Sequence, residues 1–376
     1  MSAEAPLKGL RVLELARVLA GPWIGQALAD LGADVLKVEA PEGDETRQWG
    51  PPFVEGAGGA RGSAAYFHCA NRGKRSAVAD FRTEAGRALV REEAARADVL
   101  IENFKVGGLA KYGLDYESLS VPNPRLIYCS ITGFGQDGPY AARPGYDFLI
   151  QGLSGLMSIT GEADGPPQKV GVAVTDIVTG LYGAIGILAA VEQRHRTGRG
   201  QHIDMALMDC AMAMLANQAM NALVTGRAPA RRGNAHPNIA PYRVFACADG
   251  HLIAAVGNDR QFAALAKLLG APALARDARF ATNPARVANR EALDAALEPL
   301  VAARSRAALL SAMEAAGVPG GPINDIAEAL ADPQVVARGL AIAPGGVPSL
   351  RGPWRFSDAE LSLDRGAPER GGAEEP

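Results

Sequence analysis

Along the first part of the chain, short apolar runs typical of strands alternate with segments whose apolar residues recur at the spacing of a helix. Short apolar runs at Leu10–Leu15 and Asp34–Glu39 predict strands, and the apolar and small residues of 23–31 predict a helix between them. A strand, a helix and a strand within about thirty residues form a βαβ unit, which places a parallel sheet at the start of the chain. The same alternation predicts a helix over 83–97 and further strands over 98–103, 125–130 and 201–207.

Two longer apolar segments predict helices in the core. The first follows the run 170–180 and carries Gly180, Gly183 and Gly186 along one side. Each glycine costs a helix about 0.5–1 kcal/mol relative to alanine, so their spacing indicates that another backbone comes close, in the same chain or in a partner. The second segment, 209–225, is rich in methionine and alanine and predicts one buried helix.

The segments between these elements are rich in glycine, proline and charge. Residues 43–75 predict a long loop, in which the cations of Arg72, Lys74 and Arg75 either contact phosphate or belong to a solvated turn. Residues 226–241 predict a domain boundary, followed by a smaller unit with strands over 242–247 and 252–256 and helices over 260–269, 290–301 and 305–316. The tail from Gly366 has the composition of a disordered segment.

Composition narrows the classes of function. Hydrophobic residues make up 48% of the 376 residues, so a sizeable core can form, and a formal net charge of -3 gives no electrostatic case for nucleic acid or an anionic membrane as partner. The four cysteines form no CxxC pair and indicate thiols in a reducing compartment rather than a disulfide framework or a metal site. We find no signal peptide, and the apolar runs are too short or too polar for a membrane span, so we expect a cytoplasmic protein.

Asp176 is the candidate catalytic residue, because it is a single carboxylate at the threshold of the glycine-spaced helix. Taken alone, this position is more typical of a helix N-cap, whose side-chain oxygen accepts hydrogen bonds from the free N–H groups of the first turn. Glu39 ends a strand as the ribose-binding acid of a dinucleotide fold does. However, the turn at 16–22 holds one glycine where the dinucleotide fingerprint needs three, which argues against NAD.

Eight segments in order resemble the family III CoA-transferases, also called the CaiB/BaiF family: residues 13–22, 30–39, 43–47, 71–76, 97–104, 123–130, 197–201 and 257–262. The resemblance implies an α/β fold with a large Rossmann-like parallel-sheet domain and a smaller α+β domain. It places the large domain at 1–227, completed by 331–376, and the small domain at 228–330. It also implies an interlocked homodimer.

The resemblance places the family's nucleophile on Asp176. It implies transfer of CoA from an acyl-CoA donor to a free carboxylic acid, through an aspartyl anhydride and an aspartyl-CoA thioester. An ordinary aspartate pKa near 3.9 predicts that the carboxylate is already ionised at neutral pH. Coenzyme A enters as a substrate, and no permanently bound cofactor or metal is expected.

The family's CoA contacts fall on Leu19 and Ala20, on 79–82 with Arg82, on Asn103, Phe104 and Lys105, and on Lys111. We expect Lys105 and Lys111 to contact phosphate, with a solvated lysine as the alternative at each position. A CoA-contacting arginine of some members corresponds here to Ala40, so the adenine end is held differently.

The substrate and the reaction type are inferred from four further positions. The segment 233–238, with His236 and Asn238, replaces a run of glycines in the formyl-CoA branch, which argues against formate and oxalate and favours dicarboxylates such as succinate, glutarate derivatives or malate. Tyr146 stands where the racemases of this fold carry a histidine, and Asn258 lies close to the position of their glutamate, so transfer is favoured over racemisation. A catalytically silent CoA-binding protein is the third interpretation.

Overall fold

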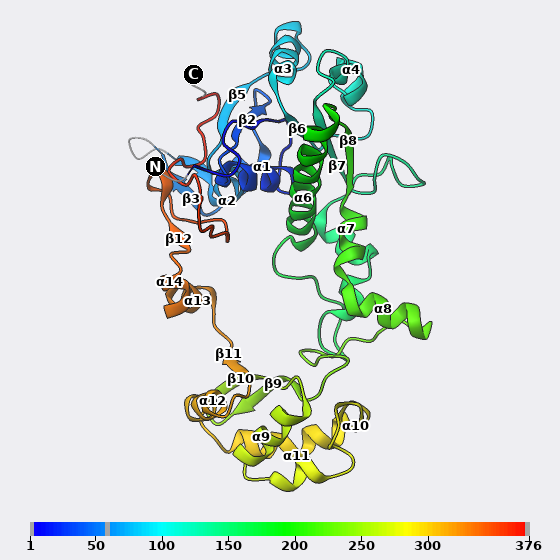
Figure 1. Ribbon diagram of the computed structural model, residues 1–376, viewed down its shortest axis with the longest axis vertical. Helices are drawn as coiled ribbons and strands as arrows, with labels where there is room; N and C mark the ends of the chain where they lie inside the picture. The colour runs from blue at the N-terminus through cyan, green and yellow to red at the C-terminus, as the bar shows by residue number, and fades with distance from the viewer. Residues whose placement is uncertain (1–3, 57–60, 373–376) are drawn as a thin grey trace. The chain divides into compact units, whose positions relative to one another are not determined.

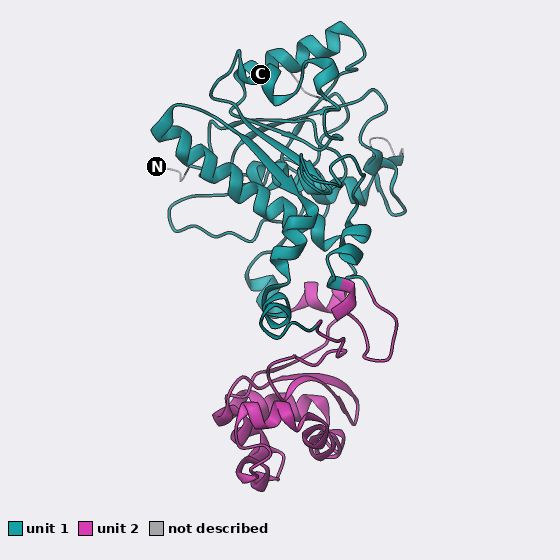
Figure 2. Cartoon of the chain, turned by 90° about the vertical axis from the view of Figure 1, so that its right-hand side faces the viewer, with its two compact units in different colours: residues 1–156, 169–227, 333–376 teal, residues 157–168, 228–332 magenta. Residues whose placement is uncertain are grey.

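The structure is a computed structural model that describes residues 4–56 and 61–372. The chain forms two compact units, coloured separately in Figure 2. Unit 1 comprises residues 1–156, 169–227 and 333–376, and unit 2 comprises residues 157–168 and 228–332. The sequence predicts that residues 157–168 belong to the large domain, but this segment groups with unit 2 because its contacts are made there.

Unit 1 is built on a six-stranded parallel sheet, as predicted, in the order β5-β2-β1-β6-β7-β8 (Figure 1). The chain runs outward from β1 to β2 and β5, returns to β6 beside β1, and then runs outward in the other direction. The order of strands thus reverses between β1 and β6. The strands are β1 Arg11–Glu14, β2 Asp34–Glu39, β5 Arg75–Val78, β6 Val99–Glu102, β7 Ile127–Thr132 and β8 His202–Ala206.

Both faces of this sheet are buried. Helices α1 (Ala20–Asp30), α6 (Val174–Thr197) and α7 (Leu207–Met214) pack on one face, where Val12, Ile101 and Cys129 point. Helices α3 (Glu84–Arg96) and α4 (Tyr116–Ser120) pack on the other, where Leu13 and Leu100 point. Burial on both faces explains why the strands are almost continuously apolar.

The glycines of α6 allow close packing against α1 of the same chain. A Cβ atom on Gly180 would lie 2.9 Å from Trp23 Cδ1, and one on Gly183 would lie 2.5 Å from Ile24 Cδ1. A Cβ on Gly186 would come no nearer than 3.7 Å to another atom, Ile203 Cγ2. The close approach predicted from the glycine spacing is thus present at Gly180 and Gly183.

Three sequence predictions in unit 1 are wrong. Residues 43–75 are not one loop but contain η1 (Glu45–Gln48), the hairpin of β3 (Phe53–Glu55) and β4 (Arg61–Ala64), and α2 (Ala65–Asn71), which Phe67 and Ala70 anchor in the interior. The tail is ordered at 366–372, where Gly73 N donates to Gly366 O and Gly371 N to Ser76 Oγ, at 3.2 and 3.1 Å. Residues 373–376 lie outside the described part.

The third is the single buried helix over 209–225. The chain breaks at Ala216, whose φ is 44°, into α7 and α8 (Ala216–Thr225), and α8 buries none of its residues. Helix α6, by contrast, is longer than its apolar run suggested. It is long and apolar enough to cross a membrane by length and composition, yet it is partly buried against α1, α7 and the sheet.

Unit 2 is α+β, with the antiparallel sheet β11-β10-β9 and five helices. Phe245, Leu252, Leu265, Leu297 and Leu309 contribute to its separate core. Its elements are β9 Tyr242–Cys247, β10 Gly250–Ala255, α9 Asp259–Leu268, α10 Asn283–Ala288, α11 Arg290–Ala302, α12 Arg306–Ala315, β11 Gly320–Pro322 and α13 Ile326–Ala331. In unit 1, α5 spans Asp147–Leu153 and α14 spans Pro333–Ala337, followed by the pair β12 Ala341–Ile342 and β13 Ser349–Leu350.

Candidate active site

Asp176 occupies the first turn of α6 but does not cap it, because the N-cap residue is Ala173. Its side chain is half-buried. Burial disfavours the charged carboxylate and the negative charge of Asp147 adds to this, so the pKa of Asp176 is raised to about 7. The prediction of an ordinary, fully ionised aspartate at neutral pH is therefore wrong, and the carboxyl group titrates near neutrality.

Asp147 performs the capping that sequence reasoning assigned to Asp176. Its Oδ1 accepts hydrogen bonds from the backbone N of Thr175 at 2.9 Å and from Thr175 Oγ1 at 2.8 Å, while Oδ2 accepts from Gln151 Nε2 at 2.8 Å. Asp147 is the first residue of α5, so a carboxylate from another helix satisfies the start of α6. Nothing local in the sequence signals this pairing.

Tyr66 on α2 lies in the electric field of the same two carboxylates. Burial, followed by the charge of Asp176, raises the pKa of Tyr66 to about 12, so its hydroxyl stays protonated at neutral pH. The ring of Trp49 contacts Tyr66 edge to face, with the two centroids 5.2 Å apart. Sequence analysis did not single out either aromatic residue, since both fall in the segment predicted to be a loop.

The loops that follow β1 and β6 are joined where the strand order reverses. Asn103 Oδ1 accepts from Arg17 N at 3.0 Å, and Asn103 Nδ2 donates to Arg17 O at 2.7 Å. In open α/β sheets, ligands bind outside the carboxyl ends of the strands at such a reversal. Five predicted CoA contacts follow these two strands: Leu19, Ala20, Asn103, Phe104 and Lys105.

Helix α6 connects Asp176 with this edge of the sheet. Gly180 lies one turn after Asp176, and residues four apart occupy the same side of a helix. A Cβ atom on Gly180 would lie 3.1 Å from the carbonyl oxygen of Ala20. The side of α6 that carries Asp176 is therefore the side that packs on the start of α1.

The predicted CoA contacts differ in what they can offer a ligand. Arg82 and Phe104 line a cleft of about 250 Å³ together with Ala40 and Tyr112, and Arg82 is paired there with Asp80 at 2.8 Å. The side chains of Leu19 and Ala20 are buried in the protein, which leaves only their backbone for contacts with CoA.

The two predicted phosphate contacts are exposed lysines. Lys105 lines a second cavity of about 280 Å³, and Lys111 Nζ lies 4.8 Å from the centroid of the Tyr112 ring. Within residues 4–56 and 61–372, neither lysine forms an ion pair. Both therefore remain available to an anionic ligand.

A buried charge network holds the loop between β1 and α1. Lys37 Nζ lies 3.2 Å from Glu14 Oε1 and 3.0 Å from Asp44 Oδ2, and it donates to the carbonyl oxygen of Ala16 at 2.7 Å. Asp44 Oδ2 also accepts from Val18 N at 3.3 Å, and Val18 has a φ of 70°, in the left-handed region that a β-branched residue rarely adopts. Fully buried charges thus fix a strained loop beside the predicted CoA contacts.

The three cations at 72–75 are each paired with a carboxylate of the protein and do not form a phosphate site. Lys74 is fully buried and lies 2.8 Å from Glu14 Oε2, and Arg72 is buried against Asp30 at 2.6 Å. Arg75 pairs with Asp34 at 2.8 Å. Neither sequence interpretation of the cluster, phosphate contact or solvated turn, holds for Arg72 and Lys74, because their charges are neutralised inside the protein.

The three predicted substrate contacts lie in both units. Tyr146 precedes α5 in unit 1 and its side chain is 67% exposed. His236 and Asn238 belong to unit 2, where Asn238 N donates to His236 Nδ1 at 3.1 Å. Asn258 caps α9 by accepting from Gln261 N at 3.0 Å, which gives it a structural role. Among the described residues, no group of three His, Cys, Asp or Glu side chains could hold a metal ion.

Comparison with known proteins identifies the family. Residues 7–374 match CoA-transferase family III. A succinate–glutarate CoA-transferase of Agrobacterium fabrum is 59% identical, covering 98% of this chain and 94% of its own. An acetyl-CoA:oxalate CoA-transferase of Acetobacter aceti is 43% identical over 97% of this chain and 93% of its own.

The structural comparison agrees. The crystal structure of a CaiB/BaiF family protein from Brucella suis superposes with a TM-score of 0.88 at 62% identity, covering 98% of this chain and 97% of that chain. The parallel sheet, the smaller α+β unit and the eight sequence segments of this chain therefore point to the same family. The chain belongs to CoA-transferase family III and is a CoA-transferase.

Proposed function

We propose that this protein transfers CoA from a dicarboxylyl-CoA such as succinyl-CoA to a free dicarboxylic acid such as glutarate, with Asp176 as the nucleophile. The relative from Agrobacterium fabrum supports the substrate pair. The observation that carries the role of Asp176 is its position in the first turn of α6, on the side that packs on the start of α1 at the strand reversal. Ligands of open α/β sheets bind at that edge.

The reaction proceeds through four exchanges of acyl groups. The Asp176 carboxylate attacks the thioester carbonyl of the donor, which forms an anhydride and releases CoA thiolate. The thiolate then attacks the Asp176 carbonyl, releases succinate and leaves an aspartyl-CoA thioester. The acceptor carboxylate attacks this thioester, which forms a second anhydride and releases CoA thiolate again. The thiolate then attacks the acceptor's acyl carbonyl, which gives the new acyl-CoA and releases the Asp176 carboxylate.

The surroundings of Asp176 suit this chemistry. Only the ionised carboxylate is nucleophilic, and a pKa near 7 leaves about half of the free protein in that form at neutral pH. Burial removes water that would otherwise solvate the nucleophile. The backbone N–H groups of Val174, Thr175 and Ile177 already donate to Val172 O, Asp147 Oδ1 and Ala173 O, so these three are engaged within the protein and do not stabilise the oxyanion.

The proposed CoA site comprises Leu19, Ala20, Arg82, Asn103, Phe104, Lys105 and Lys111. Its backbone groups and its arginine lie around the 250 Å³ cleft and the strand reversal, and its two lysines are exposed without ion pairs in the described residues. The tyrosine, histidine and amide at 146, 236 and 238 remain proposed substrate contacts. No permanently bound cofactor is needed for the four exchanges.

We also propose a cytoplasmic homodimer. Unit 1 exposes large apolar side chains on three helices, including Phe148 on α5, Ile185 on α6 and Leu223 on α8, which are 59%, 61% and 78% exposed. We propose that a second copy of the chain covers these apolar side chains. Light scattering of the purified protein tests the oligomeric state directly.

Racemisation of 2-methylacyl-CoA is the rival activity. It requires an acid and a base on either side of the α-carbon. Tyr146 here is exposed at the start of α5, and Asn258 is occupied as the cap of α9. Both observations favour transfer over proton exchange.

The test is a panel of acyl-CoA donors and free acids, with oxalate included because one relative is named for it. Mass spectrometry detects new CoA thioesters, and hydroxylamine added during turnover should trap an acyl hydroxamate at Asp176. We expect Asp176→Ala to lose transfer entirely. Full activity of that variant, or solvent exchange of an α-proton without any transfer, would refute the proposal.

A further inference from the structure

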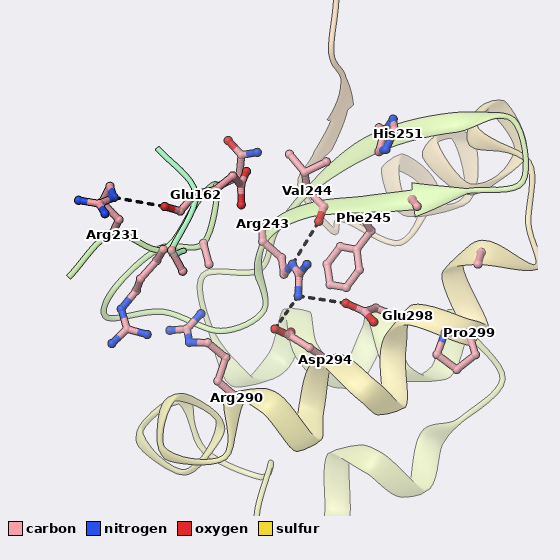
Figure 3. A pocket seen from close by; sticks show the side chains of 16 residues that line it. Glu162, Arg231, Arg243, Val244, Phe245, His251, Arg290, Asp294, Glu298 and Pro299 are labelled. Carbon is pink, nitrogen blue, oxygen red and sulfur yellow. Dashed lines mark hydrogen bonds and ion pairs between the residues drawn. The ribbon is translucent and has the colours of Figure 1, made fainter. Parts of the chain in front are cut away.

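Unit 2 contains an open cavity of about 780 Å³, to which the proposed transfer mechanism assigns no role (Figure 3). It lies over β9 and along the length of α11, and the segment 231–235 and residues 162–163 also line it. Apolar side chains such as Val244 and Phe245 form part of its lining. The charged residues of the lining are four arginines and three carboxylates: Arg231, Arg232, Arg243, Arg290, Glu162, Asp294 and Glu298.

The charges in this cavity are unevenly paired. Arg243 Nη1 lies 2.6 Å from Asp294 Oδ2 and 3.2 Å from Glu298 Oε1, so one arginine engages two of the three carboxylates (Figure 3). Arg231 donates instead to the carbonyl oxygens of Glu162 and Gly165, at 3.2 and 2.8 Å. A backbone carbonyl orients a guanidinium but does not neutralise it.

Arg290 and Arg232 lack an ionic partner. Arg290 Nη2 donates to the carbonyl oxygen of His236 at 2.8 Å, and no carboxylate within the described residues lies within ion-pair distance of either arginine. The Arg232 side chain is exposed and forms no hydrogen bond or ion pair among residues 4–56 and 61–372. Partial burial and the positive charge of Arg232 lower the pKa of Arg290, and together they outweigh the opposing negative charge of Asp294. The two cations therefore repel each other in the free protein.

We propose that Arg232 and Arg290 bind a carboxylate group of a small dicarboxylic acid in this cavity. A guanidinium presents two parallel N–H donors that match a carboxylate, and an anion between two like charges removes their repulsion. The choice of a dicarboxylic acid rests on the proposed function. The apolar residues Val244 and Phe245 suit the methylene chain of such an acid, and the carboxylates of Asp294 and Glu298 disfavour a more highly charged ligand.

A ligand bound to Arg290 affects the segment 236–239, which contains two proposed substrate contacts. Arg290 holds the carbonyl oxygens of His236, Pro237 and Ile239, at 2.8, 3.4 and 3.4 Å. A carboxylate bound to Arg290 competes for the same guanidinium, so binding is coupled to the conformation of 236–239. The proposed substrate contacts His236 and Asn238 lie in that segment.

The test is isothermal titration of the full-length protein with glutarate, acetate and inorganic phosphate. We expect Arg232→Gln to weaken glutarate binding at least tenfold. Arg260→Gln, which removes an exposed arginine outside the cavity, should leave binding unchanged. Arg232 is the primary target because its side chain makes no hydrogen bond or ion pair in the described residues. Arg290→Lys keeps the positive charge, but Arg290 also bonds to backbone carbonyls, so that variant needs a parallel melting curve.

Asp176→Ala separates this proposal from the transferase mechanism. We expect that variant to bind glutarate as the wild type does while losing transfer. If transfer survives in Asp176→Ala and Arg232→Gln still loses glutarate, the nucleophile proposal fails and the site stands. Unchanged glutarate binding in Arg232→Gln, absence of binding to the wild type, or equal binding of acetate or phosphate would each overturn the dicarboxylate site.

Discussion

Asp147 accepts two hydrogen bonds from Thr175, the residue immediately before Asp176 in the first turn of α6. One carboxylate therefore fixes the start of the helix that carries the proposed nucleophile, and its negative charge raises the pKa of that nucleophile. The two effects are separable, because the hydrogen bonds need an oxygen acceptor whereas the pKa effect needs a charge. An asparagine at position 147 would therefore keep the acceptor and remove the charge.

Asp147→Asn should move the acid limb of kcat/KM to lower pH. In the wild type, activity should fall as the pH drops through about 7, since protonation of Asp176 removes the nucleophile. The asparagine oxygen can still accept from Thr175, but the negative charge is gone, so the pKa of Asp176 falls. It should stay above its ordinary value because burial is the larger cause.

Asp147→Ala is the matched control for this pH measurement. It removes the hydrogen-bond acceptor together with the charge, and loss of a helix cap costs about 1–2 kcal/mol of stability. An acid limb that stays in place in Asp147→Asn would show that the two carboxylates do not interact.

Asp176→Asn should stabilise the fold at pH 8 while abolishing transfer. The folded pKa of about 7 lies above the unfolded value near 3.9, so the folded protein binds more protons between these values and its stability falls as pH rises through them. Each unit between the two pKa values corresponds to about 1.4 kcal/mol, and partial exposure reduces the effect. We expect a gain of about 2 kcal/mol at pH 8 and none at pH 4, as measured by urea unfolding.

These relationships show where sequence reasoning succeeds. The strands over 10–15, 34–39 and 98–103 were predictable because a sheet covered on both faces needs continuous apolar runs. The helix that carries Asp176 was predictable for a similar reason. In each case the determining pattern lies within the segment itself.

The failures share a non-local cause. The cap of α6 comes from Asp147, 28 residues away from its donor Thr175 in the chain, so Asp176 was assigned a role that another helix fills. In the sequence Lys74 resembles a phosphate contact, but in the structure its ammonium group is paired with Glu14 on the first strand. Sequence spacing does not reveal such pairings, and it likewise hid the arginines of unit 2, which come together from β9, α11 and a loop.

Gly183→Ala and Gly186→Ala should have opposite effects on stability. A Cβ at position 183 would meet Ile24 Cδ1 at 2.5 Å, so α6 and α1 must separate or Ile24 must leave its rotamer, at a loss of about 1–3 kcal/mol. At position 186 the nearest atom would be 3.7 Å away, and alanine should add about 0.5–1 kcal/mol through its higher helix propensity. Melting temperatures of both variants provide the measurement, and equal shifts would exclude a packing seam at Gly183.

Asp44→Asn should weaken both the fold and the binding of acyl-CoA. Lys37 is fully buried and has Asp44 and Glu14 as its carboxylate partners, so removing one negative charge leaves an imbalance in the interior that costs about 2–4 kcal/mol. Asp44 also holds Val18 in its left-handed conformation, beside the proposed backbone contacts at Leu19 and Ala20. The KM for acyl-CoA should therefore rise more than kcat falls.

Asp34→Asn is the matched control, because it breaks an ion pair of the same type with Arg75 in which the two side chains are 25% and 49% exposed. Exposed pairs contribute about 0–1 kcal/mol, and this one lies outside the cleft that Arg82 and Phe104 line. Urea unfolding should show a loss several times larger in Asp44→Asn than in Asp34→Asn. If the two variants lose the same stability and keep the same KM, the buried network neither sustains the fold nor positions the loop for CoA.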